Sequence, residues 1–149
     1  MNLYLDASVI IAVLLEETSS GAIDAFLRSS PASLTTSDFG IGECSAALVG
    51  LVGMSRKSPV QTNVLLAGLD RWIERSFDTF PIRTSDIDKA TLLVRRFDLG
   101  LRLPDAIHVV TADRLDTTLI TLDRRMAAAA NALGIRCINP ADDPADRKT

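Results

Sequence analysis

The sequence contains little cysteine and histidine, and these shortages exclude several classes of protein. Cys44 and Cys137 are the only cysteines among 149 residues. They cannot build a disulfide framework, they do not form a Cys-x-x-Cys motif, and we interpret both as small buried apolar side chains. The only histidine, His108, excludes a histidine-based zinc set and a His-pair nuclease. Neither a Walker phosphate loop nor a Gly-x-Ser-x-Gly nucleophile elbow is present.

The sequence also has no long apolar run and no excess of positive charge. Its apolar run at 9–15 is much shorter than the roughly 20 residues of a membrane-spanning helix. The N-terminus has no basic region and carries Asp6 before that run, which is atypical of a signal peptide, so we expect a cytoplasmic protein without membrane contact. The net charge of −3 argues against a broad basic surface for nucleic acid. A local basic rim or a bound metal could still attract nucleic acid to one site.

The sequence alternates short apolar runs, which are typical of strands, with segments of helical periodicity. Strands are predicted at 3–5, 33–36, 77–82, 117–122 and 135–138. Helices are predicted at 8–15 (with Ser8 as N-cap), 20–28, 39–54, 60–75, 84–97, 104–114 and 124–133. This order favours an α/β protein with a parallel sheet covered on both faces. The length fits a single domain, residues 1–139, and the charged, proline-containing segment 140–149 is predicted to be a flexible tail.

Four acidic residues occupy positions that differ from ordinary surface charges. Asp6 and Asp123 directly follow predicted strands, and ligands of parallel α/β sheets bind beyond the carboxyl ends of the strands. Asp105 opens a helix that could start at the same edge, and Glu43 could reach it from the second turn of its helix. Glu43 shares a helix face with small residues, which would allow a neighbouring element to approach: Ala46, Ala47 and Gly50. The alternatives are local: a turn at Asp6, N-caps at Asp105 and Asp123, and an exposed Glu43.

Four carboxylates in one cleft would repel one another unless some were protonated. A hard divalent cation such as Mg²⁺ or Mn²⁺ removes this conflict, because it prefers oxygen ligands and keeps several waters. Such a cation can activate a water and polarise a phosphoryl oxygen. The acids therefore point to phosphodiester hydrolysis.

The four acidic segments, taken in order, resemble the motifs of the PIN-domain family. They are Leu-Asp6-Ala-Ser8, Ile-Gly-Glu43-Cys-Ser-Ala-Ala-Leu, Leu-Pro-Asp105-Ala-Ile-His-Val-Val-Thr-Ala and Leu-Ile-Thr121-Leu-Asp123-Arg-Arg-Met. The order and the sequence context of these segments resemble the family from Met1 to about Asn139. Within the family, the segments resemble those of the VapC toxins of VapBC toxin–antitoxin pairs. The resemblance implies a three-layer α/β/α sandwich with a mostly parallel central sheet. It also implies a Mg²⁺- or Mn²⁺-dependent endoribonuclease that acts on RNA, forms a homodimer and is inhibited by a VapB-type antitoxin.

By this resemblance Asp6, Glu43, Asp105 and Asp123 form the catalytic, metal-binding set. We expect Asp6 and Asp105 to bind the metal most directly, while Glu43 and Asp123 bind through water or orient the attacking water. Two hydroxyl side chains and one arginine are expected in supporting roles, the alternatives being ordinary cap, strand and solvated residues: Ser8, Thr121 and Arg124. Two further arginines near the acids, Arg102 and Arg125, are candidate phosphate contacts.

Three questions stay open at this point. His108 lies one helical turn from Asp105 and is either a proton donor or substrate contact or, as is more common, a packed helix residue. A haloacid-dehalogenase-like phosphotransferase would need an acid at Ser8, and a receiver-like or catalytically inactive PIN-like binding module is the other alternative. The helices from 39 to 75 carry an excess of apolar residues that could bind a second copy or an antitoxin helix: Leu48, Leu51, Val52, Leu65 and Leu69.

Overall fold

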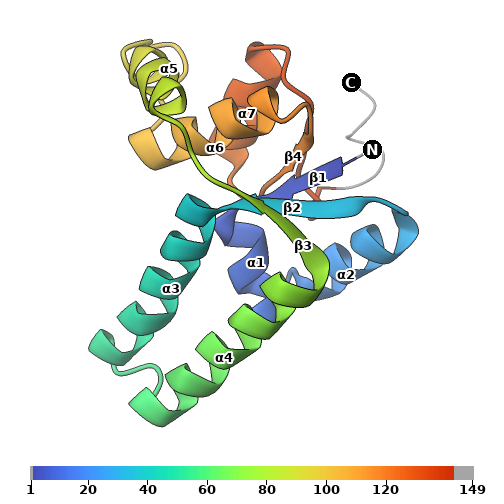
Figure 1. Cartoon of the computed structure of the whole chain (residues 1–149), viewed down its shortest axis with the longest axis vertical. Coiled ribbons are helices and arrows are strands. Elements are labelled where there is room, and N and C mark those ends of the chain that lie inside the picture. The colour runs from blue at the N-terminus through green and yellow to red at the C-terminus, as the bar shows by residue number, and fades with distance from the viewer. Residues whose placement is uncertain (1, 143–149) are drawn as a thin grey trace.

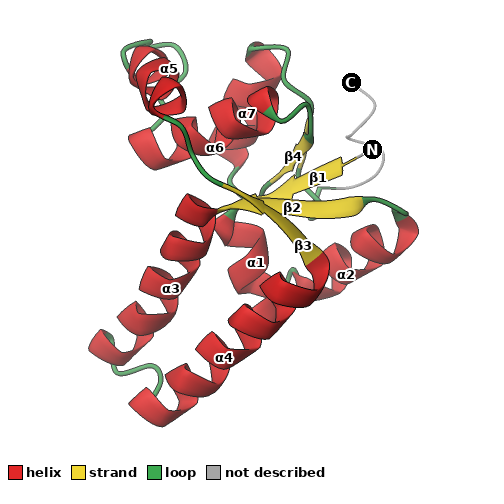
Figure 2. Ribbon diagram, in the orientation of Figure 1, coloured by secondary structure: helices red, strands yellow, loops and turns green. Residues whose placement is uncertain are grey.

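The computed structural model describes residues 2–142 as a five-stranded parallel sheet between two layers of helices (Figure 1, Figure 2). The strands are β1 (Asn2–Leu5), β2 (Ser33–Ser37), β3 (Phe77–Phe80), β4 (Thr118–Ile120) and β5 (Cys137–Ile138), in the spatial order β3-β2-β1-β4-β5. The helices are α1 (Ala7–Leu14), α2 (Ser20–Ser29), α3 (Asp38–Gly53), α4 (Pro59–Ser76), α5 (Thr84–Val94), α6 (Leu103–Arg114) and α7 (Arg124–Ala132). The predicted α/β/α architecture with a parallel sheet is confirmed.

Side chains on the central strand alternate between two separate cores. Leu3 and Leu5 of β1 are fully buried in a cluster with apolar residues of α1, α3 and α4. Tyr4, between them, faces the other way and packs with residues of α6, β4 and α7, including Val109 and Leu119. Because successive side chains of a strand point to opposite faces, this alternation is what a sheet covered on both sides requires. Helices α1 to α4 lie on one face and α5 to α7 on the other (Figure 1).

The register of β1 against its neighbours brings distant segments to one edge of the sheet. Leu5 lies beside Ile120 of β4, and the backbone N–H of Asp6 donates to the carbonyl of Ile120 at 3.2 Å. Tyr4 lies beside Thr35 of β2, two residues before that strand ends. The carboxyl ends of β1, β2 and β4 therefore lie together, followed by α1, α3 and the turn into α7.

Several predicted element ends differ from the structure for local reasons. The first helix begins at Ala7, and its N-cap is Asp6 rather than Ser8, because the Asp6 carboxylate accepts from the Val9 N–H. The third strand ends at Phe80, because Pro81 has no N–H to donate to a ladder and the Ile82 N–H donates to Asp38 instead.

The C-terminal end of α5 and the small-residue face of α3 also differ from the predictions. Helix α5 ends at Val94, so residues 95–102 form a loop. In α3, Ala46 and Ala47 are exposed and a side chain at Gly50 would meet nothing within 4 Å, so the predicted small-residue face packs against no neighbouring element. The packed face is the one that carries Cys44 and Leu48.

The predicted tail lies mostly outside the described residues, whereas both cysteines lie within them. Of the segment 140–149, only residues 140–142 lie within the described part, and Pro140 is buried. Cys44 is buried and Cys137 half-buried, and burial raises the pKa of each thiol to about 12, as expected for packing residues. Within residues 2–142, none of the helices combines the length and apolarity that a membrane span requires.

Candidate active site

All four predicted acids line one cavity of about 140 Å³ at the carboxyl edge of the sheet. The cavity is bounded by the following residues: Asp6, Ala7, Ser8, Glu43, Arg102, Asp105, His108, Asp123 and Met126. Three of the acids belong to the first turns of helices: Asp6 is the N-cap of α1, Asp123 is the N-cap of α7, and Asp105 lies in the first turn of α6. Helix N-termini carry partial positive charge, which favours carboxylates there. The predicted N-cap role is confirmed for Asp123 but not for Asp105, because Arg102 is the N-cap of α6, and Asp6 caps a helix instead of starting a simple turn. All four acids also share one cavity.

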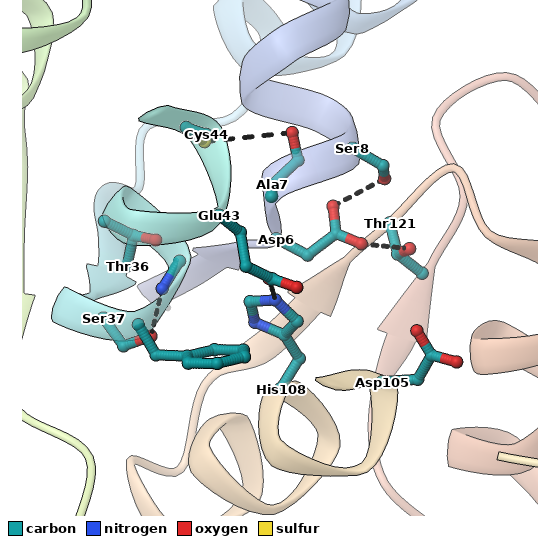
Figure 3. Close-up of polar contacts among 12 residues, drawn as sticks. Asp6, Ala7, Ser8, Thr36, Ser37, Glu43, Cys44, Asp105, His108 and Thr121 are labelled. Atoms are coloured by element: carbon teal, nitrogen blue, oxygen red, sulfur yellow. Dashed lines mark hydrogen bonds and ion pairs between the residues drawn. The ribbon is translucent and has the colours of Figure 1, made fainter. Parts of the chain in front are cut away.

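Asp6 is the most deeply buried of the four, at 2% exposure, and both of its oxygens are hydrogen-bonded (Figure 3). Oδ1 accepts from the Ser8 hydroxyl at 2.7 Å and the Val9 N–H at 3.1 Å, while Oδ2 accepts from the Thr121 hydroxyl at 2.6 Å. Burial raises the pKa of the Asp6 carboxyl above its ordinary value, although the charge of His108 and these hydrogen bonds act in the opposite direction. The fold thus holds Asp6 in one orientation at an energetic cost to its ionised form.

Asp105 and Asp123 share a single cationic partner, Arg102. The Arg102 guanidinium donates through Nε to Asp105 Oδ2 at 3.0 Å and through a terminal nitrogen to Asp105 Oδ1 at 3.2 Å. The same terminal nitrogen lies 3.8 Å from Asp123 Oδ2. The other oxygen of Asp123 caps α7 by accepting from the N–H groups of Arg125 and Met126. Each of these acids is therefore positioned locally by its own helix and joined to the other through Arg102.

Glu43 contacts His108, which a chain of hydrogen bonds links to Tyr4 and Ser37. The His108 Nε2 and Glu43 Oε2 atoms lie 2.5 Å apart, and the two side chains meet in Figure 3. On its other side, His108 Nδ1 lies 2.9 Å from the Tyr4 hydroxyl, which lies 2.8 Å from Ser37 Oγ. Ser37 in turn caps α3 by accepting from the Gly40 N–H. The chain fixes the His108 ring between β1 and α3, so Glu43 meets an oriented partner.

Within residues 2–142, no three His, Cys, Asp or Glu side chains are already arranged as a metal-binding group. The donor chemistry nevertheless fits Mg²⁺ or Mn²⁺, because the acids offer carboxylate oxygens and no thiol lines the cavity. Arg102 lies beside Asp105 and Asp123, and the His108 ring lies beside Glu43. The residues are suitable for a divalent cation, and three of the four acids meet a nitrogen-bearing side chain of the protein itself.

The three predicted supporting residues differ in where they lie. Thr121 is fully buried, donates to Asp6 and accepts from the Asp123 N–H at 3.0 Å, so it links two of the acids. Ser8 donates to Asp6 and accepts from the Leu122 N–H at 3.1 Å. Arg124 does not line the cavity; its side chain is 87% exposed and lies 3.8 Å from Asp142. The structure therefore places Thr121 and Ser8 at the site and Arg124 outside it.

Tyr4 and Ser37 were missed from the sequence, and so was the bond between Arg102 and Asp105. Tyr4 is read as an ordinary apolar strand residue, although a hydroxyl in a fully buried strand needs a partner and could have been a signal. Ser37 ends β2 and precedes a helix, so its capping role was predictable but its bond to Tyr4 was not. Arg102 was expected at the rim as a phosphate contact; it does line the cavity with its side chain 69% exposed, and its guanidinium also bonds Asp105 and lies 3.8 Å from Asp123.

A parallel α/β/α fold with an acidic cavity at the carboxyl edge of the sheet defines the class of the protein. Residues 3–132 match the model of the PIN domain, so the chain belongs to the PIN-domain family. The resemblance read from the four acidic segments is thereby confirmed at the level of the family. No curated protein matches the sequence significantly.

Solved structures with a similar fold include toxins and toxin–antitoxin complexes. FitAB bound to the IR36 DNA fragment has a TM-score of 0.73 at 18% identity, and the match covers 95% of this chain and 96% of that one. VapC20 of Mycobacterium tuberculosis, a toxin that cleaves the sarcin–ricin loop, has a TM-score of 0.67 at 16% identity over 86% of this chain and 95% of that one. VapBC2 of Rickettsia felis, bound to a promoter DNA fragment, has a TM-score of 0.68 at 12% identity over 93% and 98% of the two chains. At these identities the likeness shows the fold.

Proposed function

We propose that this protein is a metal-dependent endoribonuclease and the toxin of a type II toxin–antitoxin pair. The observation that carries the proposal is the meeting of Asp6, Glu43, Asp105 and Asp123 around one cavity, from segments up to 117 residues apart (123 − 6). Family membership and the toxins among the structural neighbours favour nuclease activity in general. The proposal places the protein in the cytoplasm, where its RNA substrate and a VapB-type antitoxin would be met.

The residues of the cavity divide into those that hold a cation and those that position groups around it. Bound Mg²⁺ or Mn²⁺ would polarise a phosphoryl oxygen and lower the pKa of a water. Asp6 and Asp105 would hold the ion, since Asp6 is fixed by three hydrogen bonds and Asp105 lies at the start of α6. Glu43 and Asp123 would orient the water that attacks the phosphorus, which leaves 5′-phosphate and 3′-hydroxyl ends.

His108 is assigned a positioning role in this scheme. It touches Glu43 with one ring nitrogen and Tyr4 with the other, and its side chain is 3% exposed. A group so enclosed orients Glu43 and does not reach the RNA. Of the two interpretations of His108, the packed helix residue agrees with its burial, and we propose positioning of Glu43 in place of the role of proton donor or substrate contact.

Cleavage assays on matched acid variants test the proposal. Single-stranded RNA is incubated with the purified protein in EDTA, Mg²⁺ or Mn²⁺, and with Asp6→Asn and Asp105→Asn. Asp116→Asn is the control, because Asp116 is 91% exposed, lies before β4 at the opposite edge of the sheet, and its positive φ of 51° is tolerated by asparagine. We expect metal-dependent cleavage by the wild type and Asp116→Asn only. Cleavage retained in both site variants would refute the assignment, and the absence of metal binding in calorimetry would favour a non-catalytic module.

We further propose that the exposed face of the α3–α4 hairpin contacts the antitoxin or a second copy. Of the five apolar residues predicted for this role, Leu48, Leu51 and Leu69 are buried core residues, which corrects the expectation for these three, and Val52 and Leu65 are half-buried. Other apolar side chains on the two helices and their connection are more than half exposed: Val49, Met54, Val60 and Val64. The hairpin extends away from the sheet (Figure 1), so this face is accessible to a partner.

Light scattering after size-exclusion chromatography tests the homodimer. The wild type is expected to elute as a dimer and Val64→Glu as a monomer, whereas Leu92→Glu is the control, because Leu92 is similarly exposed at 62% but lies on α5. A dimer in all three proteins would place the interface elsewhere. A monomeric wild type would leave this hairpin face to the antitoxin, and co-expression with the product of a neighbouring reading frame would then show the complex.

A further inference from the structure

The guanidinium of Arg102 occupies the space between two acids that are expected to serve a metal ion. It makes two hydrogen bonds to the Asp105 carboxylate, at 3.0 and 3.2 Å, and lies 3.8 Å from Asp123. An arginine guanidinium is not deprotonated in proteins, so the cavity holds a positive charge at this place. Both oxygens of Asp105 are therefore directed at Arg102.

The rest of the cavity has no other cation for these two acids. Glu43 is paired with His108, and Asp6 accepts from two hydroxyl groups and one backbone N–H. Arg102 lines this cavity of about 140 Å³, and its guanidinium engages both oxygens of Asp105 and lies close to Asp123. A divalent ion that binds Asp105 directly therefore competes with the guanidinium for the same carboxylate oxygens.

The attachment of Arg102 allows its guanidinium to leave Asp105 without disturbing the fold. Its side chain is 69% exposed, whereas that of Asp105 is 6% exposed, so the guanidinium reaches the acid from solvent. The Arg102 backbone is held independently, because its N–H donates to Asp105 Oδ2 at 3.2 Å and its carbonyl accepts from the Ala106 N–H at 3.0 Å. The side chain can thus rotate outward while the start of α6 keeps its position.

We propose that Arg102 is a displaceable internal cation that neutralises Asp105 and Asp123 in the metal-free protein and competes with Mg²⁺ or Mn²⁺ for them. The inference rests on the proposed metal-dependent function. It assigns to Arg102 a role opposite to that of a metal-site support: its presence lowers the affinity of the cavity for the ion. The benefit to the metal-free protein is that a nearly buried carboxylate keeps a charged partner.

Calorimetric titration of the metal-free protein with Mn²⁺ measures this competition directly. Arg102→Ala and Arg102→Gln are compared with the wild type and with Arg136→Ala. The control also removes one arginine from an ion pair, because Arg136 lies 2.6 Å from Asp116, at the other edge of the sheet. Since a solvent-exposed pair contributes modestly, we expect both Arg102 variants to bind Mn²⁺ about three- to tenfold more tightly than the wild type and the control.

Two outcomes of the titration overturn the inference in different ways. Equal or weaker Mn²⁺ binding by the Arg102 variants, with binding retained in the wild type, refutes the competition and leaves the metal-dependent function standing. Absence of Mn²⁺ binding in all four proteins refutes both. Thermal denaturation gives a second measure: the rise in Tm on adding Mn²⁺ should be larger for Arg102→Ala and Arg102→Gln than for the wild type.

A spectroscopic measurement observes the displacement itself in the unmodified protein. The Arg102 Nε–H, which is bonded to Asp105, gives a signal in ¹⁵N-labelled protein that is assigned by its loss in Arg102→Gln. Addition of diamagnetic Mg²⁺ should move or broaden this signal while the Arg136 signal stays in place. A Mg²⁺-saturated protein with an unchanged Arg102 signal would contradict the proposal.

Discussion

Replacement by alanine should have opposite effects at two glycines of α3, Gly40 and Gly42. A methyl group added at Gly40 would lie 2.9 Å from Thr36 Oγ1 and 3.4 Å from His108 Cε1, whereas one at Gly42 would meet nothing within 4 Å. Thr36 cannot easily yield, because it is fully buried and its hydroxyl donates to the Leu5 carbonyl at 3.0 Å. Gly40 therefore allows β2, α3 and His108 to approach one another closely.

The magnitudes follow from helix propensity and from packing. Replacing glycine by alanine inside a helix gains about 1 kcal/mol, so Gly42→Ala should stabilise the protein by about that amount. At Gly40 the same gain is opposed by overpacking, which costs about 2–3 kcal/mol in a rigid core, for a net loss of about 1–2 kcal/mol. The two variants should therefore differ by about 2–3 kcal/mol, or on the order of 4–12 °C in Tm for a chain of this size.

Urea denaturation in EDTA measures this difference without any contribution from a bound metal. Ribonuclease assays on the same variants test the link to the site, because a shifted His108 would move its partner Glu43. Gly40→Ala is expected to lower the cleavage rate and Gly42→Ala to leave it unchanged. If Gly40→Ala proved as stable and as active as Gly42→Ala, the close contact inferred between α3 and His108 would be wrong.

Three further predictions concern buried polar groups. Because burial raises the folded-state pKa of Asp6, the native state binds its proton more tightly than the unfolded chain does, and stability falls as pH rises from the unfolded pKa, about 3.8, to the folded one. In EDTA, Asp6→Asn should remove this decline, so a parallel decline in both proteins would contradict the assignment. Tyr4→Phe leaves His108 Nδ1 without its hydrogen-bond partner. The free energy of unfolding, measured by urea denaturation, should fall by about 1–3 kcal/mol, and RNA cleavage should become slower. Unchanged values in both assays would exclude a positioning role for the contact. Arg114→Met leaves the Asp86 carboxylate, which is 1% exposed, without its cation. This variant should lose about 3 kcal/mol of stability, while the cleavage rate of the folded protein should not change. The double variant Asp86→Asn with Arg114→Met, which removes both charges, should recover part of the lost stability.

The alternation of strands and helices was predictable because it depends on local patterns. Hydrophobic periodicity, turn residues and helix caps are properties of a few neighbouring residues, and they located all five strands and seven helices of the described part to within a few residues. Asp6 and Asp123 were recognised as site candidates for the same reason, since each directly follows a strand and precedes a helix. The positions that were wrong, such as the N-cap of α1, concern which of two adjacent polar side chains faces the backbone.

By itself the sequence determined the fold class, the four acids and the edge of the sheet at which they meet. Only the tertiary structure decided the strand order β3-β2-β1-β4-β5, the chain from Tyr4 through His108 to Glu43, and the position of Arg102 between Asp105 and Asp123. The physical reason is separation along the chain: Tyr4 and His108 are 104 residues apart, and Glu43 and His108 are 65 apart. Periodicity reports which side chains are buried, whereas the choice of partner among buried groups depends on which strands lie side by side and on which rotamers their packing permits.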